Sequence, residues 1–183
     1  MIAHLAGVVE DATAGRLSGP PDDAQSAEQV DRHRGDEPEA LLESWTASAP
    51  PFEEVIDQLK IWPGAIDVLT HEHDIRHALG RPGARDDELL ALAVPLLVDR
   101  LDVAVRLRVI AGDVDVSTGP VDGANLTLRT TPFEFFRVGL GRRTRDQVRT
   151  LDWSGDPEPV LDGLFVFGPS SIPIIEGPGP PAV

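Results

Sequence analysis

The sequence contains no cysteine among its 183 residues, which excludes disulfide bridges, thiolate zinc sites and a protein-borne thiol nucleophile. It has no apolar run near the roughly 20 residues that a membrane-spanning helix needs, and residues 1–4 carry no signal-peptide features. Basic residues are scarce, with 16 against 31 acidic ones and a net charge of -15. We therefore expect a cytoplasmic protein that binds neither nucleic acid nor an anionic membrane.

The hydrophobic patterning predicts an α+β fold. Helical periodicity favours helices over residues 1–17, 38–47, 52–59, 65–79, 87–101, 132–140 and 157–166. Alternation of period two favours strands over 103–109, 113–117, 125–130 and 147–153. Residues 18–38 are rich in Gly, Pro, Asp and Ser and predict a surface loop with at most a short helical turn, and Pro50-Pro51 is expected to break a helix.

The order of these elements predicts two domains. Helices come first, and strands mixed with helices follow, which is typical of a helical unit joined to a small α+β unit. The cluster Gly80-Arg81-Pro82-Gly83 is a candidate boundary. We expect a helical domain over residues 1–83, an α+β domain over 84–168 and a Pro-rich, poorly packed tail over 169–183.

Residues 67–77 hold the densest group of metal-ligand side chains. Asp67 and His71 are four residues apart and share one helical face, as do His73 and His77 about 200° round the helix. A metal needs a third ligand, and His4 lies in an apolar helical stripe, so His4, Asp67 and His71 form a candidate two-His, one-carboxylate site.

A purely structural reading of the same residues stays open at this point. Asp74 could pair with Arg76 or His77, and His71 could be a hydrogen-bonded core histidine.

The only dense basic run is Arg142-Arg143-Thr144-Arg145. In an acidic protein these arginines could hold a carboxylate of a substrate or cofactor. The alternative is a solvated helix end, where arginine near the last carbonyls is mildly favourable.

Three segments resemble the mycothiol-dependent maleylpyruvate isomerase family. The first is Ile2-Ala3-His4-Leu5-Ala6-Gly7, similar to the stretch with the family's first metal-binding His. The second, over residues 67–83, includes His71-Glu72-His73-Asp74-Ile75-Arg76 and Ala78-Leu79-Gly80. It resembles a helix of the family and is the most specific of the three matches. The third, over residues 133–168, includes Gly141-Arg142-Arg143 and Asp152-Trp153-Ser154-Gly155-Asp156.

The resemblance implies a DinB-like helical bundle followed by a sterol-carrier-like α+β domain. His4, Asp67 and His71 match the family's metal ligands, usually for zinc, although Asp67 stands where a family pattern has Glu. Family members have a helix before the first matching segment, so we expect a bundle that lacks its first helix. Such a bundle exposes an apolar groove that a homodimer would cover.

The chemistry implied by the resemblance is a cis–trans isomerisation or thiol transfer on a small carboxylate such as maleylpyruvate. A divalent metal lowers the pKa of the mycothiol thiol, the thiolate adds to a cis double bond, and elimination follows rotation. Arg142, Arg143 or Arg145 would hold the substrate carboxylates. The alternatives are a non-catalytic module that binds a small ligand or partner beside a vestigial metal site, and a product without independent function.

Overall fold

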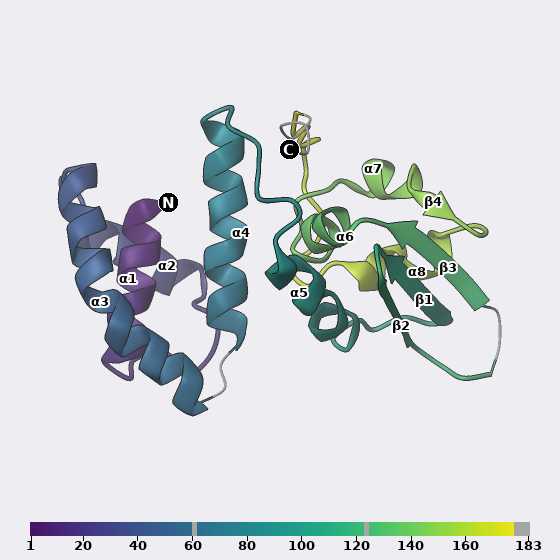
Figure 1. Cartoon of the computed structure of the whole chain (residues 1–183), viewed down its shortest axis with the longest axis horizontal. Helices are drawn as coiled ribbons and strands as arrows, with labels where there is room; N and C mark the ends of the chain where they lie inside the picture. Colours follow the sequence, from purple (N-terminus) through teal and green to yellow (C-terminus); the bar gives the residue numbers. More distant parts are fainter. Residues whose placement is uncertain (60–61, 123–124, 178–183) are drawn as a thin grey trace. The chain divides into compact units, whose positions relative to one another are not determined.

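The computed structural model describes residues 1–59, 62–122 and 125–177, and it has an α+β fold. Its described residues form eight α-helices, one short 3-10 helix and a four-stranded mixed sheet (Figure 1). The chain divides into two compact units, Met1–Ile75 and Arg76–Val183. The division falls in the last turn of a helix, shortly before the boundary expected at Gly80–Gly83.

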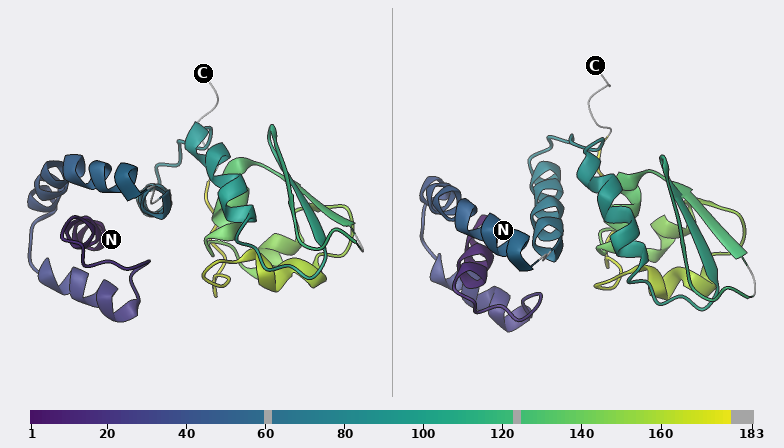
Figure 2. Two further views of the ribbon diagram at one scale, coloured as in Figure 1. Left: turned by 90° about the horizontal axis from the view of Figure 1, so that it is seen from below. Right: turned by 60° about the horizontal axis from the view of Figure 1, so that its bottom comes forward.

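The N-terminal unit is helical, as the sequence predicted. Its helices are α1 (Ile2–Thr13), α2 (Asp23–Arg32), α3 (Pro38–Leu59) and most of α4 (Trp62–Ala78). Helix α1 packs against both α2 and α3, which lie on opposite sides of it (Figure 2). The apolar side chains that this packing buries include Leu5, Val9, Leu41 and Phe52.

Helix α2 lies in the segment predicted to be a loop, so that prediction was wrong. A capping box starts the helix: Asp22 accepts a hydrogen bond from the Gln25 backbone N–H at 2.8 Å, and the Gln25 side chain accepts one from the Asp22 N–H at 3.1 Å. The side chain that α2 buries most completely is a polar one, Gln29. Apolar periodicity is therefore weak here, and the capping box was the available signal.

Helix α3 runs without a break from Pro38 to Leu59, so the predicted break at Pro50-Pro51 was also wrong. Proline removes one backbone donor and leaves the carbonyl four residues earlier without its usual partner. Both prolines are exposed, and so are Thr46 and Ala47, whose carbonyls lose those partners. Water can satisfy these carbonyls, while Leu41 before the prolines and Phe52 directly after them anchor the helix in the core.

The C-terminal unit is built on a sheet with strand order β2-β1-β3-β4. Its elements are α5 (Glu88–Val98), β1 (Arg106–Ala111), β2 (Val114–Thr118), β3 (Asn125–Thr130), α6 (Pro132–Gly139), α7 (Arg145–Arg149), β4 (Asp152–Trp153), α8 (Glu158–Leu161) and the 3-10 helix η1 (Asp162–Leu164). Strand β1 pairs antiparallel with β2 and parallel with β3. Leu107, Val109 and Leu128 are fully buried on one face, toward which α5 packs.

Most of the predicted elements of this unit are confirmed, including the strand over 125–130 and the helix that Thr131 caps. The strand predicted over 147–153 was wrong, because residues 147–149 belong to helix α7 and only Asp152–Trp153 is a strand. Thr144 and Gln147 form a capping box that starts α7. The helix predicted over 157–166 is shorter and ends in a 3-10 turn.

The segment after Gly168 is packed more tightly than its proline content predicted. The carboxylate of Glu176, whose side chain is 5% exposed, lies 2.7 Å from Arg137 Nη2 and 2.7 Å from Arg143 Nη2. The backbone carbonyl of Ile174 accepts a hydrogen bond from Gln147 Nε2 at 2.9 Å. These contacts hold the segment through residue 176 against the body of the unit.

None of the described helices combines the length and the apolar character needed to cross a bilayer.

Candidate metal centre

The structure brings His4, Asp67 and His71 together within the N-terminal unit. Asp67 and His71 lie one turn apart on α4, and His4 comes from α1. Each offers one ligand atom, and these atoms all lie within 4.8 Å of one another. The convergence of residues so distant in sequence is what the spacing argument and the family resemblance both predicted.

The two imidazoles approach edge to face. Their ring centroids are 5.3 Å apart and the rings are inclined by 80°. His71 Nε2 lies 3.4 Å from Asp67 Oδ1, so this nitrogen is on the side of the shared site. The other ring nitrogen, Nδ1, lies 3.4 Å from Asp74 Oδ2. A carboxylate behind a ligating histidine is the usual arrangement in metal sites, where it fixes the tautomer and the ring orientation.

The donor atoms are only partly satisfied by the protein. His4 Nδ1, His71 Nδ1 and Asp67 Oδ2 are buried and lack a hydrogen bond of normal geometry, although Asp74 lies at ion-pair distance from His71. A buried polar atom left unsatisfied costs about 1–3 kcal/mol. Two imidazoles and one carboxylate suit zinc and other first-row divalent metals, and an ion bound here would compensate this cost at the Asp67 carboxylate. The residues present therefore fit a metal.

The two histidines have opposite protonation tendencies in the metal-free protein. Burial lowers the pKa of His4, an effect that Asp67 opposes and His71 reinforces. Hydrogen-bonding contacts with Asp67 and Asp74 raise the pKa of His71 to about 9, against the effect of burial. His71 is therefore protonated at neutral pH, and a metal would have to displace that proton.

The second helical pair singled out from the sequence does not form an equivalent site. His73 is buried and His77 is exposed, so the two side chains meet different environments. Asp74, which the sequence suggested could pair with Arg76 or His77, faces His71. Its position three residues after His71 is a helical spacing and could have indicated this contact.

The three candidate arginines belong to the C-terminal unit and have different surroundings. Arg143 is buried and makes a bidentate contact with Glu134, from Nε to Oε1 at 2.6 Å and from Nη2 to Oε2 at 2.8 Å. It also contacts Glu176. Burial acts to lower the pKa of Arg143, but Glu134 and Glu176 together raise it. Arg142 donates to the Leu140 carbonyl at 2.6 Å.

Arg145 is the most accessible of these arginines. Its side chain is 47% exposed and pairs at 2.6 Å with Asp162, which is 86% exposed. It lines a cleft of about 620 Å³ together with Thr144, Gln147, Ser170 and other residues. All three arginines stay candidates for binding a substrate carboxylate. Arg143 already holds two carboxylates of the protein, whereas the side chain of Arg145 is exposed.

Compared with models of known protein families, with curated proteins and with solved structures, the chain shows no match.

Proposed function

We propose that this protein is a metal-dependent enzyme that uses mycothiol to isomerise, or transfer a thiol to, a small maleylpyruvate-like carboxylate. The observation that carries the proposal is the convergence of His4, Asp67 and His71. Its link to the maleylpyruvate isomerase family, with a DinB-like bundle and a sterol-carrier-like domain, rests on the sequence motifs around these residues.

The ligand set supports a catalytic rather than a purely structural metal. Structural zinc sites are closed by four protein ligands, whereas three protein ligands leave a position for an exogenous group. The chain has no cysteine, so a reactive thiol must come from a small molecule. Zinc bound at such a site would lower the pKa of a coordinated thiol and supply thiolate at neutral pH.

The chain's own residues have distinct tasks in this proposal. Asp67 and His71 present two ligand atoms from one helical face. Asp74 orients the His71 ring through Nδ1, the ring nitrogen that faces away from the metal site. In the C-terminal unit, Arg145 has an exposed guanidinium, for which a small carboxylate would compete with the exposed Asp162.

Elemental analysis of the purified protein tests the metal site. We expect about one zinc per chain in the wild type, and a clear loss in His71→Ala. The matched control is His77→Ala, which removes an exposed histidine of the same helix and should leave the zinc content unchanged. A wild type without metal after zinc has been supplied, or equal zinc in both variants, would overturn the site.

Activity is tested separately with mycothiol and maleylpyruvate. Zinc-dependent conversion of the cis to the trans isomer, lost when mycothiol is omitted and in His71→Ala, is the expected result. Zinc binding without this conversion would leave the metal site standing but refute the proposed reaction. A metal-free protein that retains an apolar ligand would instead favour the non-catalytic binding module.

A further inference from the structure

Gln29 of α2 is fully buried against α1, close to the candidate ligand His4. The two helices pack closely at Gly7, one turn after His4, where an added Cβ would lie only 2.6 Å from Gln29 Cβ. The Gln29 side chain has 0% exposure. A long polar side chain is seldom buried so completely unless its amide group has partners.

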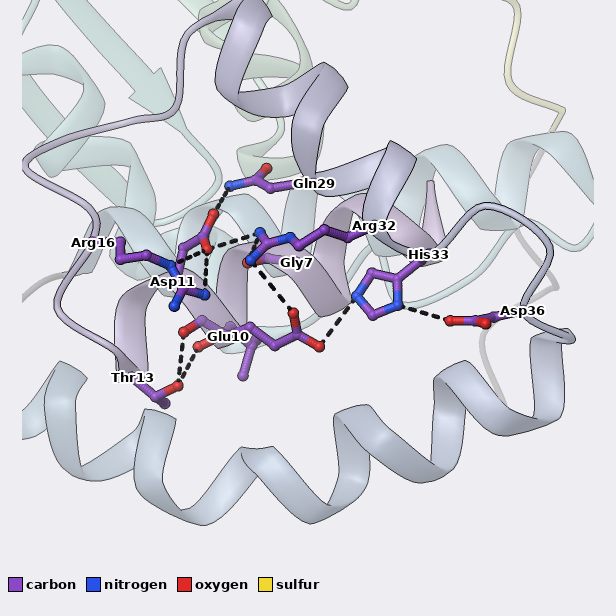
Figure 3. A network of polar contacts seen from close by, with 10 residues as sticks. Gly7, Glu10, Asp11, Thr13, Arg16, Gln29, Arg32, His33 and Asp36 are labelled. Carbon is purple, nitrogen blue, oxygen red and sulfur yellow. Dashed lines mark hydrogen bonds and ion pairs between the residues drawn. The ribbon is translucent and has the colours of Figure 1, made fainter.

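One end of the Gln29 amide is fixed by Asp11. Gln29 Nε2 donates to Asp11 Oδ2 at 2.8 Å, and Asp11 Oδ1 accepts from Arg16 Nε and Arg32 Nη2, each at 2.8 Å (Figure 3). Burial acts to raise the pKa of Asp11, but these three donors together lower it, so the carboxylate is ionised. An ionised carboxylate can only accept hydrogen bonds, so it must face the amide NH2 group.

The other end of the amide is consequently an acceptor, Oε1, which points away from Asp11 (Figure 3). Oε1 is buried and lacks a hydrogen bond of normal geometry, and so does His4 Nδ1. Burial lowers the pKa of His4, and the contact of its ring with the Gln29 side chain acts in the opposite direction. The unsatisfied acceptor on α2 and the unsatisfied ring nitrogen on α1 would form a hydrogen bond with each other after a small rotation of the two side chains.

We propose that Gln29 is a positioning residue for His4. The Nδ1–H of His4 donates to Gln29 Oε1, which leaves the lone pair of Nε2 for a metal shared with Asp67 and His71. Asp11, Arg16 and Arg32 act one step further out by fixing which way the amide points. The inference rests on the proposed metal function, and it makes Gln29 the counterpart at His4 of Asp74 at His71.

The experiment compares the wild type with Gln29→Met, which keeps the length of the side chain and removes the acceptor. Glu10→Gln is the matched control, because it weakens the contact of α1 with Arg32 and His33 at the end of α2 and leaves Gln29 and Asp11 in place. Long-range proton–nitrogen NMR of the metal-free proteins at neutral pH reports which nitrogen of His4 carries the proton. Competition with a chelator then gives the zinc affinity of each protein.

We expect the Nδ1–H tautomer of His4 in the wild type and in Glu10→Gln, and its loss in Gln29→Met. Zinc affinity should fall about 10- to 100-fold in Gln29→Met, the usual effect of removing a residue that orients a metal ligand, and should be unchanged in Glu10→Gln. An unaltered tautomer and affinity in Gln29→Met would overturn the proposal.

Two outcomes separate this inference from the proposed function. If the wild type binds no zinc but its Nδ1–H tautomer of His4 is lost in Gln29→Met, the metal function is refuted and the contact of His4 with Gln29 stands. A wild type in which His4 carries its proton on Nε2 refutes the inference by itself, without any variant that has to fold.

Discussion

Changing Glu176 to glutamine should strongly destabilise the C-terminal unit. The carboxylate bridges Arg137 and Arg143, with both contacts at 2.7 Å and with all three side chains at most 6% exposed. Removing one partner from a buried ion pair costs about 3–5 kcal/mol. Glutamine keeps an acceptor oxygen, and Glu134 still contacts Arg143, so we expect the lower end of that range, about 3 kcal/mol.

Urea denaturation provides the assay. Trp153 belongs to the C-terminal unit, so its fluorescence reports that unit once Trp45 and Trp62 are replaced by phenylalanine. With a denaturant slope of about 1–2 kcal/mol per molar, the expected loss lowers the urea midpoint by about 1.5–3 M. The matched control is Asp162→Asn, which removes an exposed ion pair with Arg145 and should cost less than about 1 kcal/mol. Equal, small shifts in the two variants would refute the reasoning.

Three further predictions concern the N-terminal unit. Asp11→Asn should lower its free energy of unfolding by about 1.5–3 kcal/mol near neutral pH. Burial acts to raise the pKa of Asp11, but three donors together lower it below its usual value of 3.8 in the folded state. This contribution should therefore be constant above about pH 5 and fade as the pH falls through the folded pKa; urea titrations at several pH values that show no fading would contradict it. Gly7→Ala should cost about 1–3 kcal/mol in thermal unfolding through overpacking on Gln29, whereas Gly19→Ala, which meets open space, should cost nothing comparable. Zinc at 100 times its dissociation constant should stabilise the wild type by about 2.7 kcal/mol, and calorimetry that shows the same gain in His71→Ala would count against the site.

The fold could be predicted wherever apolar residues repeat regularly or turn chemistry is explicit. The strand over 125–130 alternates between the core and the opposite face, and Thr131-Pro132 marks the start of α6, so both are read from local sequence. Helix α2 lacks such apolar periodicity, because it is held to α1 mainly by polar contacts that involve residues far apart in the chain, and its local signal is the capping box. The order of the strands, with β1 beside β3, is likewise set by tertiary packing.

The candidate site was predictable in its ligands but not in their surroundings. Asp67 and His71 share a face by helical spacing alone, and His4 was the remaining histidine in an apolar stripe. Gln29 carries no comparable signal, since a glutamine on a polar segment is normally exposed. The burial of Arg143 depends on Glu176, which is 33 residues later in the sequence, and a run of arginines alone does not reveal a distant partner.

The position of Glu176 also bears on when the C-terminal unit can become complete during synthesis. Arg143 leaves the ribosome 33 residues before the carboxylate that it contacts. At about 5–20 residues per second, this interval lasts roughly 2–7 s. The N-terminal unit is by then fully synthesised. In the nascent C-terminal unit, Arg137 and Arg143 must stay solvated, or the unit must stay partly folded, until Glu176 has been added. The last residues of the described chain therefore set the earliest moment at which this unit reaches its final packing.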